Sequence, residues 1–215
     1  MLTIQRFSCN MLSENCYIVS DETRQCVIID CGAFYEEEHE AIANYIAGNQ
    51  LTPVKLLATH GHADHHFGNG ALYRLYGLRP EVAAEDEPLM KTIQEQASQM
   101  FMISADLHVP PVGRLLEGDG EAIPFGNHQL TVIETPGHSP GSVAYYCREE
   151  GVVFTGDTLF RGSIGRTDLP GGSMMQIIQS LRRLAQLPDE TTVYPGHGEE
   201  TTIGNEVAHN PYMDR

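Results

Sequence analysis

The chain has 215 residues, of which 41% are hydrophobic and 20% charged, as is usual for a globular protein with a buried core. Its formal net charge of -16 argues against a surface that follows a nucleic acid backbone. No apolar run approaches the ~18 residues of a membrane span, and the N-terminus has no signal-peptide pattern. The five cysteines lack C-x-x-C spacing and are interpreted as reduced thiols, so we expect a cytoplasmic protein.

Short apolar, β-branched runs recur along the chain, and helical patterns lie between some of them. The runs at 16–20 and 26–30 flank a polar segment, which predicts a β-hairpin. Further strands are predicted at 54–59, 81–84, 129–134, 142–147, 151–155 and 192–194, and helices at 36–47, 85–100 and 174–187. Residues 102–120 are the least regular and are expected to form a mobile loop or lid. One mixed α/β domain over residues 1–215 fits this pattern best.

The segment LLATHGHADHHFGN, residues 56–69, places a histidine cluster directly after a predicted strand. Side chains alternate along extended backbone, so His60 and His62 are expected to point the same way and to bind one metal ion. Asp64 and His65 follow at a turn, where they could face a second ion, although Asp64 could instead cap the following helix. His66 is expected to point away from both ions, and the remaining histidines, which have no such context, are expected at the surface: His39, His108, His128 and His209. Read alone, the tract could also be an adventitious metal-binding stretch.

Three later segments share one form, in which an apolar strand is followed by a glycine-containing turn and a possible ligand. They contain His138 in TPGHS, Asp157 in TGDT and His197 in PGHG. Two ligand sets are therefore predicted, which are His60, His62 and His138 for one ion and Asp64, His65 and His197 for the other. Asp157 remains, and its two carboxylate oxygens can bridge ions ~3.5–4 Å apart. Three nitrogens, a bridging oxygen and a position open to water are typical of a catalytic site.

The ordered series THGHADH, GHS, GDT and GHG resembles the metallo-β-lactamase superfamily over nearly the whole chain. The resemblance implies a four-layer αββα sandwich with the metals at one edge, and it implies that Asp30 in IIDCG supports the ligands from behind. Two further segments, DTLFRGSIGRTDLPGG and TTIGNEVAHNPYM, resemble the small, single-domain glyoxalase II-like hydrolases, whose substrates are thioesters such as S-D-lactoylglutathione. The chain has GRTDLPGG where glyoxalase II usually has GKFYEG, and it ends without the basic segment that holds glutathione there. The resemblance therefore leaves the acyl group and the thiol carrier open.

Metal-assisted hydrolysis of a small-molecule thioester or ester is the predicted reaction. A water shared by two cations is expected to lose its proton near neutral pH, with Asp64 and Asp157 as the catalytic residues. Zinc is the first choice for these ligands, and Fe or Mn would also suit them. By resemblance, Arg166 occupies the place where glyoxalase II presents a lysine to its substrate, and its guanidinium could bind a substrate carboxylate. Alternatively, Arg166 pairs with Asp168 and only shapes the loop.

The main alternative is an oxidoreductase of the same superfamily. Persulfide dioxygenases use one Fe(II) held by two histidines and an aspartate, a set that His60, His138 and Asp157 resemble, and they also carry a GRTD string. A metal-storing protein is a third alternative, but it would need closed coordination. Neither a nucleic acid nor a membrane is expected as a partner, and the sequence leaves the oligomeric state open.

Overall fold

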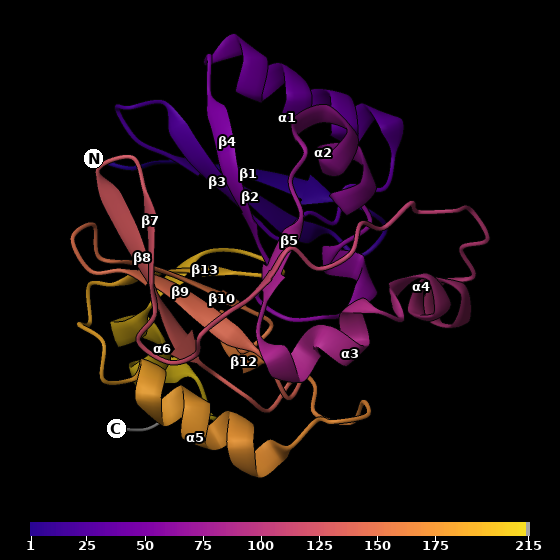
Figure 1. Cartoon of the computed structure of the whole chain (residues 1–215). Helices are drawn as coiled ribbons and strands as arrows, with labels where there is room; N and C mark the ends of the chain where they lie inside the picture. The colour runs from indigo at the N-terminus through magenta and orange to yellow at the C-terminus, as the bar shows by residue number, and fades with distance from the viewer. Residues whose placement is uncertain (214–215) are drawn as a thin grey trace.

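The computed structural model describes residues 1–213, which form two β-sheets packed face to face with helices on both outer sides (Figure 1). The first sheet contains, in spatial order, β1 (Thr3–Cys9), β2 (Glu14–Ser20), β3 (Gln25–Ile29), β4 (Thr52–Leu57), β5 (Pro80–Val82) and β6 (Arg114–Leu115). Strands β1 to β3 pair antiparallel, whereas β3 to β6 pair parallel.

The second sheet contains, in spatial order, β14 (Thr201–Thr202), β13 (Thr192–Pro195), β10 (Val152–Gly156), β9 (Val143–Cys147), β8 (His128–Glu134) and β7 (Ala122–Phe125). Its pairs are antiparallel except β10 with β13. A separate small hairpin is formed by β11 (Leu159–Phe160) and β12 (Ser163–Ile164).

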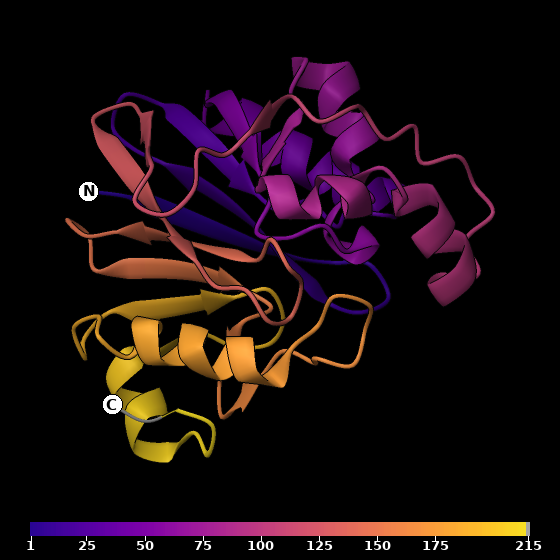
Figure 2. The ribbon, with the colours of Figure 1, turned by 60° about the horizontal axis from the view of Figure 1, so that its bottom comes forward.

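Helices complete the four layers (Figure 2). The outer face of the first sheet is covered by α1 (Glu36–Gly48) and α2 (Asn69–Tyr76), and that of the second sheet by α5 (Met174–Leu184) and α6 (Ile203–His209). Helices α3 (Glu87–Met90) and α4 (Ile93–Phe101) lie to one side of the sandwich, and two short 3-10 helices, η1 (Ala63–His65) and η2 (Ala84–Asp86), precede α2 and α3. No helix within residues 1–213 is long and apolar enough to cross a membrane.

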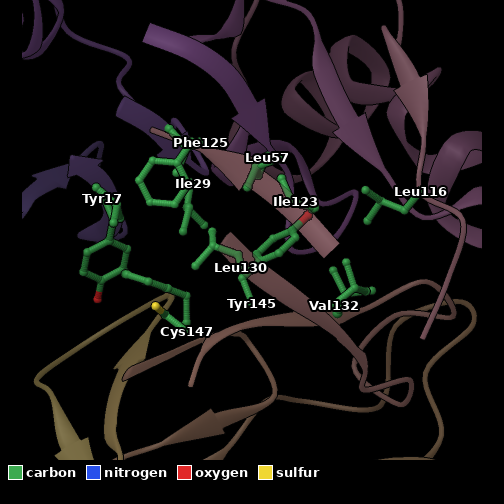
Figure 3. Close-up of a cluster of buried hydrophobic side chains, with 14 of the residues drawn as sticks. Tyr17, Ile29, Leu57, Leu116, Ile123, Phe125, Leu130, Val132, Tyr145 and Cys147 are labelled. Carbon is green, nitrogen blue, oxygen red and sulfur yellow. The ribbon is translucent and has the colours of Figure 1, made fainter. Parts of the chain in front are cut away.

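The main core lies between the two sheets (Figure 3). Alternate residues of β2 face opposite sides, so Tyr17 and Val19 pack between the sheets while Cys16 and Ile18 pack in the layer that contains α1. Both faces of this strand are covered, and for that reason its central run, residues 16–19, is continuously apolar rather than alternating. The sheets are thereby fixed against each other, and their loops are held at defined edges.

The predicted αββα architecture and the hairpin of β2 and β3 are confirmed, but several local predictions are wrong. The continuous helix predicted at 85–100 is broken into η2, α3 and α4, with Met90 and Ile93 on either side of the second break packed in one apolar cluster. The stretch 102–120 is irregular as predicted, except for the two residues of β6, whose pairing with β5 extends the first sheet; its role as a lid stays a prediction. Strands β1 and β7 were not predicted, because β1 is largely exposed and β7 is short and alternating.

Candidate metal centre

The predicted ligand residues follow strands whose carboxyl ends meet at one edge of the sandwich. In the second sheet, β8, β10 and β13 run in the same direction, and each is followed by a short turn that carries one of these side chains. Strand β4 of the first sheet supplies the histidine-rich segment from the opposite side. The sheet topology therefore brings together residues that lie more than a hundred positions apart in the chain.

The first cluster consists of His60, His62 and His138, which are all buried. Their ring centroids lie 4.6–4.9 Å apart, and one nitrogen from each ring lies within 4.8 Å of the others. His62 Nδ1 lies 2.9 Å from His138 Nε2, whereas the buried Nε2 of His60 has no hydrogen-bond partner. Three convergent nitrogens, one of them unpartnered, are what a metal ion would satisfy.

The second cluster consists of Asp64, His65 and His197. Asp64 Oδ2 lies 3.3 Å from His197 Nε2 and 3.7 Å from His65 Nε2. The Nε2 atom of His65 is buried and has no hydrogen-bond partner. Asp64 does not cap the following helix, since no side-chain cap bond is present at η1 or α2, and its carboxylate faces the two histidines instead.

Asp157 lies between the two clusters. Its Oδ2 is 3.6 Å from His138 Nε2 and 3.6 Å from His197 Nε2, while its buried, unpartnered Oδ1 is 3.4 Å from His65 Nε2. One carboxylate thus reaches both nitrogen sets. The two clusters with this shared aspartate suit a dinuclear metal site.

Several histidine rings are oriented by a hydrogen bond on the side away from the centre. His65 Nδ1 donates to Asp30 Oδ2 at 2.9 Å, as the predicted supporting role of Asp30 requires. Thr59 Oγ1 also donates to Asp30, at 2.7 Å, and lies 3.0 Å from His60 Nδ1. The carbonyls of Arg166 and Leu12 lie 2.8 and 3.1 Å from the Nδ1 atoms of His138 and His197. These contacts hold each ring through Nδ1 and turn its Nε2 toward the centre.

The two clusters differ in charge. Burial, together with neighbouring histidines, lowers the pKa of His60 well below its usual value and that of His62 to about 4. Burial alone would also lower the pKa of His65, but the carboxylates of Asp157, Asp64 and Asp30 raise it well above its usual value. Without metal, His60 and His62 therefore favour the neutral imidazole, whereas His65 in the second cluster favours the protonated form beside its carboxylates.

Arg166 does not turn its guanidinium to the centre. Its Nε and Nη2 atoms donate to the two carboxylate oxygens of Asp168, at 2.7 Å each, and both side chains are exposed. The alternative local pairing is thus present, and the substrate-binding role stays a prediction.

Two other histidines act outside the clusters. His66 is buried, and its Nε2 donates to the His60 carbonyl at 2.7 Å. His128 was expected at the surface, but its side chain is only 7% exposed because it is held between Asp21 and Glu150. That expectation was wrong.

Two supporting residues were not identified from the sequence. Asn10, in the turn after β1, donates from Nδ2 to the carbonyls of Asp64 and Gly32 at 2.9 Å each. Asp86 contacts the loops on both sides of the first cluster. Neither residue belongs to a recognisable motif. The sequence shows only a polar residue at the end of a regular element, which does not indicate a supporting role.

Residues 10–197 of the chain match the sequence model of the metallo-beta-lactamase superfamily. It belongs to that superfamily. Hydroxyacylglutathione hydrolase GloC of Haemophilus influenzae is 33% identical over 215 residues and is covered to 99%, as is this chain. The probable metallo-hydrolase YqgX of Bacillus subtilis is 35% identical over 199 residues, which are 92% of this chain and 90% of that protein.

Solved structures agree with this assignment. The BLEG-1 B3 metallo-beta-lactamase superposes with a TM-score of 0.89 at 32% identity, covering 98% of this chain and 99% of that chain. TTHA1623 in a di-iron-bound form gives a TM-score of 0.84 at 38% identity, with coverages of 97% and 100%. ETHE1 from Myxococcus xanthus gives 0.75 at 30% identity, with coverages of 97% and 83%. The family, the fold and the clusters identify a metal-binding hydrolase of the metallo-β-lactamase superfamily.

Proposed function

We propose that this protein is a dinuclear-metal-dependent thioesterase that hydrolyses a small thioester such as S-D-lactoylglutathione or a related thiol ester. The observation that carries the proposal is the position of Asp157 between two sets of nitrogen and oxygen ligands, with unpartnered buried atoms on His60, His65 and Asp157 itself. The similarity to hydroxyacylglutathione hydrolase GloC supports a thioester as the substrate class. The five buried free thiols suit a cytoplasmic location, where cysteines stay reduced.

The two aspartates would have separate tasks in this reaction. Two bound divalent cations would acidify a shared water and polarise the substrate carbonyl. Asp64 faces the other members of the second cluster, His65 and His197, through Oδ2, so its other oxygen could accept a hydrogen bond from the attacking water and orient it. Asp157 spans both clusters and would fix the separation between the ions. A thiolate is a good leaving group, so the reaction needs no strong general acid.

Zinc is our first choice of metal, because imidazole and carboxylate ligands in three-nitrogen and mixed sets suit it. Iron would also suit these ligands, and the di-iron-bound form of TTHA1623 supports it as the second choice.

One alternative function has support from the comparisons. The similarity to ETHE1 favours an iron-dependent persulfide dioxygenase, which would use His60, His138 and Asp157 around a single ion. That function would give Asp64, His65 and His197 no role as metal ligands, although they form a complete second set. We therefore favour hydrolysis.

Metal content measured together with oxygen uptake and a thioester panel tests the proposal. We expect about two metal ions per chain and hydrolysis of at least one thioester at an unchanged rate without oxygen. One iron per chain with oxygen consumption on a persulfide would establish the dioxygenase instead. The variant His65→Ala separates the two further, because it should lower hydrolysis strongly and leave a mononuclear dioxygenase much less affected.

A further inference from the structure

A buried carboxylate outside both clusters connects the two loops that carry the first cluster. Asp86 ends η2 and is 0% exposed. Its Oδ2 accepts hydrogen bonds from the backbone N–H of Gly61 at 2.7 Å and from the Ser139 hydroxyl at 2.6 Å. Its Oδ1 accepts a hydrogen bond from the backbone N–H of Gly141 at 2.6 Å. Both carboxylate oxygens are therefore used.

These partners lie next to the histidines of the first cluster. Gly61 separates His60 from His62 in the loop after β4, which belongs to the first sheet. Ser139 directly follows His138 in the loop after β8, which belongs to the second sheet. One side chain thus ties together ligand loops that arise from two different sheets.

The loops pack directly against Asp86 and leave no room for side chains at the glycines. A Cβ atom on Gly61 would lie 2.6 Å from Leu89 Cβ and 3.0 Å from the Asp86 carbonyl oxygen. A Cβ atom on Gly141 would lie 2.6 Å from the Asp86 nitrogen and 2.8 Å from its Cβ. Such distances are shorter than normal van der Waals contact, so the close approach itself requires glycine at both positions.

The contact also requires a carboxylate rather than an amide. Three donors converge on two oxygens, and an asparagine would offer one oxygen and an NH2 group. In either orientation of the amide, its NH2 group would face the N–H of Gly61 or of Gly141. A buried N–H group without an acceptor is costly, so one ligand loop would move.

We propose that Asp86 is a positioning residue for the metal centre. It sets the distance between the loop of His60 and His62 and the loop of His138, and thereby the geometry and affinity of the first ion. It acts through two backbone N–H groups and the Ser139 hydroxyl, and it accepts no hydrogen bond from the ligand nitrogens. The second cluster is oriented by other contacts, from Asp30, Leu12 and Asn10. The inference rests on the proposed metal centre, and it predicts an effect confined to the first ion.

The test uses Co(II) as the probe, with chelator competition for the affinity of each ion and visible absorption for its geometry. Asp86→Asn should weaken the first ion by roughly 10–100-fold, as replacement of partners behind metal ligands commonly does. It should also alter the absorption of that ion, and leave the second ion within about threefold of wild type. Ser139→Ala removes one of three contacts and should weaken the first ion by a few-fold. Asp106→Asn, an exposed aspartate, is the control for loss of one charge and should change neither ion.

Two results would overturn the inference while leaving the proposed function intact. One is an Asp86→Asn variant that binds both ions with the affinities and absorption spectra of the wild type. The other is an equal loss of both ions, with the melting temperature falling by the same amount with and without metal, as for a general loss of structure. If Asp86→Asn does not fold, an unaltered first ion in Ser139→Ala overturns the inference. A wild-type protein that binds no Co(II) would instead contradict the proposed function and the inference together.

Discussion

Among single residues, Asp157 should be the least replaceable, because its carboxylate lies between the two clusters and reaches both. Asp157→Asn replaces one carboxylate oxygen by an amide nitrogen that cannot bind a cation. We expect weaker binding of both ions and a fall in turnover of roughly 100-fold or more, since each ion stabilises charge in the transition state by several kcal/mol. Metal analysis and thioester kinetics would measure these effects. Two retained ions with near-normal turnover would show that the ligand assignment is wrong.

Arg166 offers a second test at this scale, because its guanidinium is already paired with Asp168. If Arg166 binds a substrate carboxylate, Arg166→Ala should raise KM for carboxylate-bearing thioesters roughly 10-fold and leave neutral thioesters unchanged. Asp168→Asn frees the guanidinium and should not raise KM. If both variants instead change KM equally for charged and neutral substrates, Arg166 only shapes its loop.

The sequence was informative about residues that stand in motifs and uninformative about those that support them. His138, Asp157 and His197 each follow an apolar strand and a glycine, and this pattern was enough to group them. Asp86 lies in the string EDEP, which is also typical of the acidic first turn of a helix, so the string does not indicate a residue that supports ligand loops. Its role depends on a contact with Gly141, 55 positions away, which no local pattern encodes.

At the level of elements, strands covered on both faces were predictable and edge strands were not. All seven residues of β2 are buried, and its apolar run was plain in the sequence. In contrast, β6 has only two residues, and its pairing with β5 depends on the path of the preceding loop. The break between α3 and α4 was also unpredictable, because it contains no glycine or proline and follows from how the two pieces pack.

Three turns that join neighbouring strands meet at His128, and we expect their contact to depend on pH. Asp21 follows β2, His128 begins β8, and Glu150 lies between β9 and β10. The ring nitrogens of His128 lie 3.1 Å from Asp21 and 3.0 Å from Glu150, which also pairs with the amino group of Met1. Burial and the charged amino group of Met1 would lower the pKa of His128, but the hydrogen bonds to Asp21 and Glu150 raise it above its usual 6.5.

A raised pKa in the folded state means that protonated His128 stabilises the fold. This contribution is complete below about pH 6.5, the unfolded value, and is lost as pH rises through the folded value. His128→Gln should therefore lower the free energy of unfolding by about 1–2 kcal/mol at pH 6, and by less at pH 9. Chemical denaturation of metal-free protein at the two pH values measures this difference, with His209→Gln as the exposed control. An equal loss at both pH values would mean that packing, not charge, is responsible.

For the whole molecule, bound metal should act as a cross-link. The ligands come from four loops on two sheets, so ions that bind only the folded state stabilise it. With metal at about 1,000 times its dissociation constant, the gain is about 4 kcal/mol, which corresponds to a rise of roughly 10 °C in Tm for a chain of this size. Melting curves with metal and with chelator would measure it. An unchanged midpoint after confirmed removal of metal would contradict a centre that joins the two sheets.

The most direct test of the account is a titration of metal-free protein with Zn(II), and separately with Fe(II) under anaerobic conditions, while thioester hydrolysis is followed. The dinuclear assignment predicts that the rate keeps rising until two ions per chain are bound. In Asp157→Asn, the rise in rate between one and two ions per chain should be absent. A rate that saturates at one ion per chain, or no hydrolysis of any thioester with two ions bound, would contradict it.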